Sequence, residues 1–226
     1  MLTNEQIMGI DEAHLSPIGE HRLQLEVTQA FQAMREEASA AGVDLQICSS
    51  FRSFERQLSI WNRKWQGQLP LNTLDGKVLD AASLNDEEKT HAIMLWSALP
   101  GASRHHWGTD FDVYDKASVE RHQHDFQLIP EEYIGQGPCA QLSNWLNENA
   151  NSFGFYFPYA KYKGGVAAEP WHMSYKPIAQ KIIDTFDVDC LARQLNKSDI
   201  LGKTFVINNL DYLVQRYTYN KGETCQ

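Results

Sequence analysis

The sequence has little positive charge and no long apolar run. Its 20 Lys and Arg residues face 29 Asp and Glu residues, which gives a formal net charge of −9. Such a chain repels the phosphates of nucleic acids, so we expect no nucleic-acid partner. No stretch reaches the roughly 18 apolar residues of a membrane span, so we expect no membrane partner either. The first residues, MLTNEQIMGIDEAHL, do not look like a signal peptide. We expect a cytoplasmic protein, or a periplasmic one if a leader has been removed.

Closely spaced cysteines are also missing. The four cysteines, Cys48, Cys139, Cys190 and Cys225, form no CxxC pair. That is ordinary for a reducing compartment, and the disulfide state stays open. There is no repeat, low-complexity tract or clear linker. With 226 residues, of which 42% are hydrophobic, the chain can fill a core, and we expect one domain over 1–226. The sequence carries no sign of an oligomeric state.

Apolar spacing and capping residues predict the elements. Apolar residues three and four apart predict helices over 21–41, 54–66, about 85–99 and about 140–152, and Pro177 should start another helix. Residues 44–50, 109–115 and 169–175 are predicted strands, and 153–165 a strand and hairpin. The segment 66–83 has no clear period and is expected to be a long loop that covers a site. This order predicts an α+β fold, in which a small antiparallel sheet is flanked by helices. The segment 185–226 should be a C-terminal helical extension.

The stretch SRHHWGTDFDVYD, Ser103–Asp115, concentrates residues that bind metals. On a strand, Asp110 and Asp112 point to one face while the apolar residues between and after them point to the core. Gly108 permits a tight turn before the strand, which lets His105 fold back towards that face. An imidazole nitrogen and a carboxylate oxygen suit Zn²⁺, but two ligands do not make a site.

A second stretch, EPWH, supplies His172 and, three residues earlier, Glu169. Two His and one Asp leave a fourth position open for water, the arrangement of a catalytic zinc. Glu169 is well placed to take a proton from that water. In FRSFERQ, residues 51–57, Arg52 lies between a strand and a helix cap, where it could stabilise an oxyanion.

Each of these pieces has a simpler interpretation when taken alone. A histidine doublet is usually polar surface or structure, and a lone Arg52 or Glu169 is usually a solvated or ion-paired side chain. DFDVYD resembles a calcium loop only in part, because it lacks the Gly at position six and the Glu at position twelve. The joint pattern favours the zinc site.

At this point the sequence resembles a known family, the zinc D-Ala-D-Ala peptidases. SRHHWGTDFD matches the SxHxxGxxxD pattern, EPWH matches ExWH, and SSFRSFERQ is similar to SGYRSxxxQ. These are the VanY-like carboxypeptidases, whose LAS-type fold is shared with D-Ala-D-Ala dipeptidases and the Hedgehog domain. The motifs span 49–172 in family order, with a motif core of about 44–176. They leave 1–20 and about 185–226 uncovered.

The resemblance implies a role for each matching residue. One zinc ion would be bound by three ligands: His105, Asp112 and His172. Glu169 would be the catalytic base, Arg52 would polarise the substrate carbonyl, and Gln57 and Ser103 would help to position the substrate.

The family pattern assigns no role to two further residues of this motif. The family often has Ala where this chain has Asp110, which we expect to orient a ligand histidine from behind. His106 has no family role, and we interpret it as structural or as a support for the site.

The resemblance implies a zinc metallocarboxypeptidase that removes a terminal D-Ala from peptidoglycan stem peptides or muropeptides. In the cytosol, trimming recycled tetrapeptides would spare the precursors needed for cross-linking, which favours L,D-carboxypeptidase activity. A charge such as Asp110 near the site could also favour the amino group of a diamino acid. The alternative within the class is a VanY-type D,D-carboxypeptidase acting on pentapeptides that end in D-Ala-D-Ala. A non-catalytic zinc-binding module stays open, and so does a wall endopeptidase, although export and a wall-binding repeat are not evident.

Overall fold

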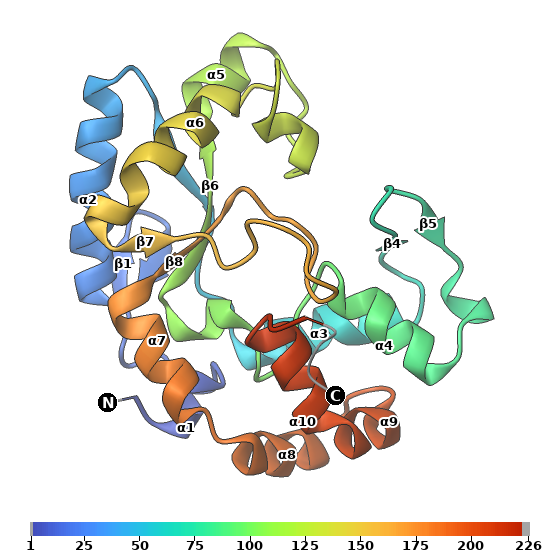
Figure 1. The fold of residues 1–226 in the computed structure, drawn as a ribbon. Helices are drawn as coiled ribbons and strands as arrows, with labels where there is room; N and C mark the ends of the chain where they lie inside the picture. Colours follow the sequence, from blue (N-terminus) through green and yellow to red (C-terminus); the bar gives the residue numbers. More distant parts are fainter. Residues whose placement is uncertain (1, 223–226) are drawn as a thin grey trace.

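The computed structural model describes residues 2–222 and has a small antiparallel sheet at its centre (Figure 1). Four strands lie in the order β3-β6-β8-β7, and every neighbouring pair is antiparallel. Their bounds are Leu45–Ser49 for β3, Asp110–Asp115 for β6, His172–Tyr175 for β8 and Phe155–Tyr156 for β7. The predicted α+β fold with a small antiparallel sheet is therefore confirmed.

The register of the sheet brings distant motifs together. Asp112 of β6 lies opposite His172 of β8, and Asp110 lies opposite Ser174. On its other side, β6 pairs with β3, where Ser49 is the partner of Asp112. Because successive side chains of a strand alternate, the two aspartates share one face of the sheet.

The opposite face of the sheet packs on helices α2 (Leu25–Ala40) and α6 (Ala140–Asn149). Phe111 of β6 is fully buried there, with its ring edge against Phe31 of α2 at 5.3 Å between ring centroids. β6 therefore places apolar side chains in the core and carboxylates on the side of the site, as its alternating sequence predicts.

A second core lies beyond the site and joins α3 (Phe54–Trp65) and α4 (Asp86–Met94) to the C-terminal segment. That segment forms α8 (Val188–Lys197), α9 (Lys203–Asn208), α10 (Leu210–Leu213) and a π-helix, η5 (Val214–Thr218). Trp61 of α3 is fully buried, and its indole donates a hydrogen bond to the carbonyl of Leu201 at 3.0 Å. The predicted C-terminal helices thus share a core with the motif-bearing part of the chain (Figure 1).

Several element boundaries differ from the predictions. The helix expected from residue 21 begins at Leu25, because 21–23 form strand β2 (His21–Leu23), which pairs with β1 (Ser16–Ile18). α4 ends at Met94 rather than near 99, and the aromatic stretch 153–165 contributes only the two residues of β7 to the sheet. The loop predicted at 66–83 holds a short hairpin, β4 (Leu71–Asn72) with β5 (Val78–Leu79).

The remaining helices connect these parts. They are α1 (Asn4–Ile7), α5 (Lys116–Arg121) and α7 (Lys176–Thr185), with short 3₁₀ turns η1 (Ala81–Ser83), η2 (Arg104–Trp107), η3 (Pro130–Tyr133) and η4 (Ala150–Phe153). Pro177 stands in the first turn of α7, as predicted. Among residues 2–222, no helix combines the length and apolar character that crossing a membrane requires.

Candidate metal centre and active site

Three side chains from separate parts of the sequence converge on the polar face of the sheet: His105, Asp112 and His172. One ligand atom from each lies within 4.8 Å of the others, and all three residues are buried. His105 comes from η2, which ends at Gly108 with φ 67°. This left-handed turn directs the chain straight into β6, and a Cβ at Gly108 would collide with the side chain of Leu15.

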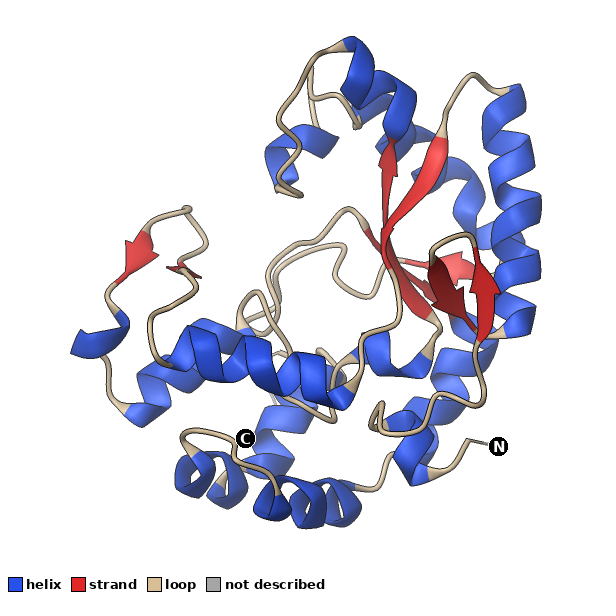
Figure 2. Ribbon diagram, turned by 180° about the vertical axis from the view of Figure 1, so that it is seen from behind, coloured by secondary structure: helices blue, strands red, loops and turns tan. Residues whose placement is uncertain are grey.

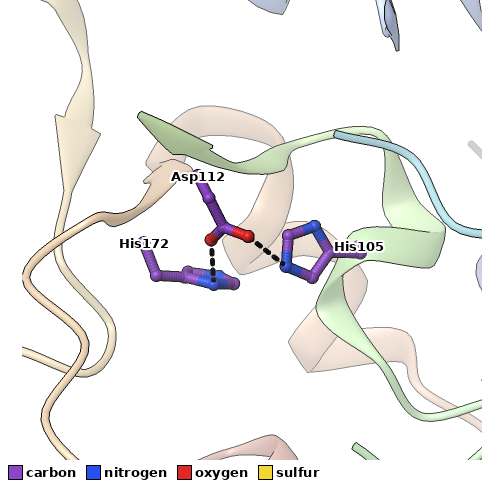
Figure 3. Close-up of side chains that lie close together, drawn as sticks. All are labelled: His105, Asp112 and His172. Carbon is purple, nitrogen blue, oxygen red and sulfur yellow. Dashed lines mark ion pairs between the residues drawn. The ribbon is translucent and has the colours of Figure 1, made fainter. Parts of the chain in front are cut away.

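Two ion pairs link the three residues (Figure 3). Nε2 of His105 lies 3.5 Å from Oδ2 of Asp112, and Nδ1 of His172 lies 3.2 Å from Oδ1 of the same carboxylate. Figure 3 shows both imidazoles turned towards the carboxylate between them. The three motif residues are therefore brought together with one nitrogen of each ring facing inward.

Hydrogen bonds from behind fix the two imidazole rings. Nδ1 of His105 donates to the carbonyl of Ser50 at 2.9 Å, and Nε2 of His172 donates to Oδ1 of Asp110 at 3.0 Å. Each ring thus uses its outer nitrogen as a donor, so that in the neutral ring, the form that binds a metal, the inner nitrogen carries the lone pair. This is the carboxylate or carbonyl support that metal-binding histidines usually have.

The converging atoms suit a cation. Oδ1 of Asp112 is buried and accepts no hydrogen bond among the described residues. Burial alone would lower the pKa of His172, yet the hydrogen bond to Asp110 and the charges of Asp110 and Asp112 raise it to about 9, whereas burial lowers the pKa of His105 to about 4. The site therefore attracts positive charge, and two imidazoles with one carboxylate fit zinc while leaving a coordination position open.

Glu169 lies beside this cluster, in the turn that leads into β8. Its Oε2 is 3.5 Å from Nδ1 of His172, and its side chain lines the cleft described below. Burial raises the pKa of Glu169 to about 7, partly offset by the charges of His172 and Arg52. A carboxylate with a pKa near neutrality suits proton transfer at that pH.

Arg52 also lines the cleft, and other residues hold it in place. Nη1 of Arg52 donates to Oε1 of Gln57 at 2.8 Å, and Nε2 of Gln57 donates to the carbonyl of Ala98 at 2.7 Å. Gln57 is fully buried and lies outside the residues that line the cleft. Its position favours an action through Arg52 rather than direct contact with a substrate.

The other two residues of the histidine motif differ in their surroundings. Ser103 is buried and lines the cleft, in keeping with a role beside a substrate. His106 does not line it; its Nδ1 donates to the carbonyl of Arg52 at 2.5 Å, and its Nε2 accepts from the backbone of Gly101 at 3.0 Å. His106 thus supports the backbone that carries Arg52.

A cleft of about 470 Å³ opens over the metal-binding residues. One side is formed by residues 72–76 at the tip of the β4–β5 hairpin, and another by residues 127–131. Figure 2 shows the hairpin standing away from the sheet, joined to the body through α3 and the 3₁₀ turn before α4. The segment predicted to cover a site therefore does contribute to its rim.

The sequence interpretation missed three contributions to the site. Arg104 is buried and pairs with Asp110, with 2.7 Å between Nε and Oδ1. Tyr159 lines the cleft with its ring edge against His172, and Tyr217 and Thr218 of the C-terminal π-helix line it as well. Of these three, only the contribution of Arg104 had a signal in the sequence. Asp110 lies on a buried strand, and a buried carboxylate needs a partner.

The surroundings of Asp110 also correct one expectation. We expected its charge to favour an amino group of the substrate. Asp110 is fully buried, does not line the cleft, and is neutralised by Arg104, which helps to hold its pKa well below the usual range although burial opposes this. That expectation is wrong, since a carboxylate saturated by internal partners has no charge to offer a substrate.

Comparison with known proteins agrees with this geometry. Residues 20–178 match the family VanY, D-alanyl-D-alanine carboxypeptidase. An uncharacterised protein of Haemophilus influenzae is 43% identical over 103 residues, which cover 43% of this chain and 70% of that protein. A D-alanyl-D-alanine carboxypeptidase of Enterococcus faecalis is 25% identical over 178 residues, or 77% of this chain, and the match spans only 56% of that protein.

Solved structures show the same fold. A variant of the vancomycin resistance D,D-pentapeptidase VanY in complex with Zn(II) is 25% identical, with a TM-score of 0.51, and the match covers 77% of this chain and 85% of that one. The L,D-carboxypeptidase LdcB has a TM-score of 0.55 at 21% identity over 78% of this chain and 75% of that one, which is a likeness of fold alone. The family indicated by the three motifs is thereby confirmed: the chain belongs to the VanY family of D-alanyl-D-alanine carboxypeptidases and is a peptide-bond hydrolase.

Proposed function

We propose that this protein is a zinc-dependent carboxypeptidase that removes a C-terminal D-Ala from peptidoglycan stem peptides. The observation that carries the proposal is the convergence of His105, Asp112 and His172, with Glu169 and Arg52 beside them in one cleft. One zinc ion would be held by Nε2 of His105, Nδ1 of His172 and the carboxylate of Asp112. When bound, the metal supplies Lewis acidity and lowers the pKa of a coordinated water.

The chain's own residues perform the proton and charge chemistry. Glu169 takes the proton of the attacking water, and the same carboxyl group then returns it to the departing amine. Arg52, held by Gln57, donates hydrogen bonds to the substrate carbonyl as negative charge develops on its oxygen. The walls of the cleft hold the peptide against these groups and limit the access of water.

A non-catalytic zinc module was the alternative from another class. Such a module has no use for a buried acid with a raised pKa, or for a guanidinium held in the same cleft. Glu169 and Arg52 have those properties here, and the family is one of hydrolases. Both facts favour the enzyme.

For the substrate we keep the order given by the sequence: a tetrapeptide ending in a single D-Ala first, and a pentapeptide ending in D-Ala-D-Ala second. Asp110 does not line the cleft, whereas Glu131 is exposed and lines it, so the carboxylate of Glu131 supports the first choice. Asp75 lines it too, but its Oδ2 already pairs with Lys77 at 2.6 Å. A structure of the similar VanYB in complex with D-Ala-D-Ala supports the second choice.

One assay tests the proposed function. Purified protein is incubated with tetrapeptide and pentapeptide muropeptides, with zinc and after chelation, and the products are analysed by mass. We expect zinc-dependent loss of one alanine. The absence of release from either peptide by the zinc-loaded protein would contradict the proposal.

We also propose a cytoplasmic location, in which recycled muropeptides are the available substrates. Cys48, Cys139 and Cys190 are all unpaired, as is usual in a reducing compartment. Fractionation of cells that express the natural gene tests this, and recovery in the periplasm would contradict it.

A further inference from the structure

A buried guanidinium, that of Arg104, pairs with the carboxylate of Asp110 that accepts from Nε2 of His172, and it also lines the cleft. The side chain of Arg104 is only 3% exposed. Its Nε donates to Oδ1 of Asp110 at 2.7 Å, and its Nη2 donates to the hydroxyls of Tyr156 and Ser174, both at 2.7 Å. The group also lies over the ring of Trp107, 4.8 Å from the centroid. Arg104 is therefore fixed on several sides.

The carboxylate of Asp110 is equally constrained. Oδ1 accepts from Arg104 and from Nε2 of His172, the latter at 3.0 Å. Oδ2 accepts from the hydroxyls of Thr109 at 2.6 Å and Ser174 at 2.9 Å. Both oxygens of Asp110 therefore accept two hydrogen bonds each. The hydroxyl of Ser174 also accepts from Arg104 while it donates to Asp110. Such a fully satisfied network holds one arrangement.

The charges explain why a cation is needed there. Three carboxylates, those of Asp110, Asp112 and Glu169, surround His172. A buried carboxylate without a counter-ion is costly, so Asp110 can act as an acceptor for His172 only if a cation compensates it. Arg104 supplies that charge by pairing with Asp110, and no ion pair joins it to Asp112 among the described residues. It therefore leaves the negative charge of Asp112 available to a metal.

We propose that Arg104 is a positioning residue for the metal centre, acting through Asp110 on His172. The Arg104–Asp110 pair keeps the Nε2 proton of His172 directed away from the cleft, so that the Nδ1 lone pair points at the site shared with His105 and Asp112. The proposal rests on the zinc site of the proposed function. It predicts that zinc affinity depends on a residue that is not itself a ligand of the metal.

The test compares Arg104→Met, Asp110→Ala and the double variant that carries both changes. Zinc affinity is measured by competition with a chromophoric chelator, and the geometry of the site by the absorption spectrum of the Co²⁺-loaded protein. The melting temperature of each metal-free variant is measured alongside. Tyr156→Phe is the matched control, because it removes one partner of Arg104 but leaves the Arg104–Asp110 pair in place.

We expect each single variant to lose about 10- to 100-fold in zinc affinity, the usual effect of removing a supporting contact of a metal ligand. The double variant should regain thermal stability, because it buries no unpaired charge, but should not regain zinc affinity or the wild-type Co²⁺ spectrum. Tyr156→Phe should bind zinc almost as the wild type does. Regained stability without regained affinity separates positioning from a purely structural role.

Two results would overturn the proposal. One is a folded Arg104→Met protein with wild-type zinc affinity; the other is a double variant with wild-type affinity, which would mean that His172 needs no acceptor. If Arg104→Met does not fold, the double variant decides the question. A wild-type protein that binds no zinc would instead contradict the proposed function, so the two failures are distinguishable.

Discussion

The amide oxygen of Gln57 accepts a hydrogen bond from Nη1 of Arg52 at 2.8 Å. Gln57 is itself fixed by the carbonyl of Ala98 and lies fully buried in the first two turns of α3. Ser53 stands just before the helix, and its hydroxyl accepts from the backbone of Arg56 and so caps the first turn. A helix cap, a buried amide and a cleft guanidinium thus form one unit, and this arrangement leads to the first two predictions.

Arg52→Ala should lower kcat about 10²- to 10³-fold with a smaller change in KM, because loss of one oxyanion partner affects mainly the transition state. Steady-state kinetics on the muropeptide that turns over best measures this. Arg52→Lys, which keeps the charge but loses the planar donor pair, should recover only part of the rate. An effect confined to KM would instead make Arg52 a clamp for the substrate carboxylate.

Gln57→Leu should slow catalysis through Arg52 and not through the substrate. We therefore expect the Arg52→Ala/Gln57→Leu double variant to be no slower than Arg52→Ala alone, because residues that act as a unit are not additive. Melting temperatures check that each variant is folded. Multiplied losses in the double variant would show that Gln57 contacts the substrate independently.

Glu169→Ala should retain zinc and lose activity. Removal of a general base costs about 10²- to 10⁴-fold, and Glu169 is not needed as a ligand in the proposed set. Metal analysis of the purified variant and its kcat give the two readings. Near wild-type turnover would place the proton acceptor elsewhere.

His172→Ala should lose both zinc and activity, whereas zinc should stabilise the wild type. A ligand held at about 100 times its dissociation constant adds about 2.7 kcal/mol to the free energy of unfolding, so chelation should lower the melting temperature. The variant should show no such shift, which serves as the control. Stoichiometric zinc in a folded His105→Ala/His172→Ala protein would disprove the ligand assignment.

The tetrapeptide should be preferred over the pentapeptide, and Glu131→Gln should reduce that preference. The residue before the scissile bond is a diamino acid with a long charged side chain in the first peptide and D-Ala in the second. An exposed acid on the rim favours the first by charge, and this effect should weaken at high salt. The measurement is the ratio of kcat/KM for the two peptides. A ratio of about tenfold or more in favour of the pentapeptide, or about 1.4 kcal/mol, would assign a D,D-carboxypeptidase.

The sequence by itself determined the chemical part of the site. Alternation along β6 put Asp110 and Asp112 on one face, Gly108 marked the turn, and the spacing of Glu169 and His172 paired an acid with an imidazole. Ser53 predicted where α3 begins. These features are local, since periodicity, capping and turn conformation depend on residues a few positions apart. The order of strands beside β6 and the facing of Asp112 and His172 required the assembled sheet.

Only the tertiary structure decided how the charges are compensated and how the cleft is closed. Arg104 reaches Asp110 and Ser174 because β6 and β8 pair in one register. Tyr217 joins the cleft from a C-terminal segment that no motif covers. The helix predicted from residue 21 begins only at Leu25, because β2 pairs with β1. The apolar spacing of the sequence contains no sign of that pairing. Which side chains are buried and which charges pair depends on segments far apart in the sequence. A local sequence pattern does not tell which distant segment will pack against it.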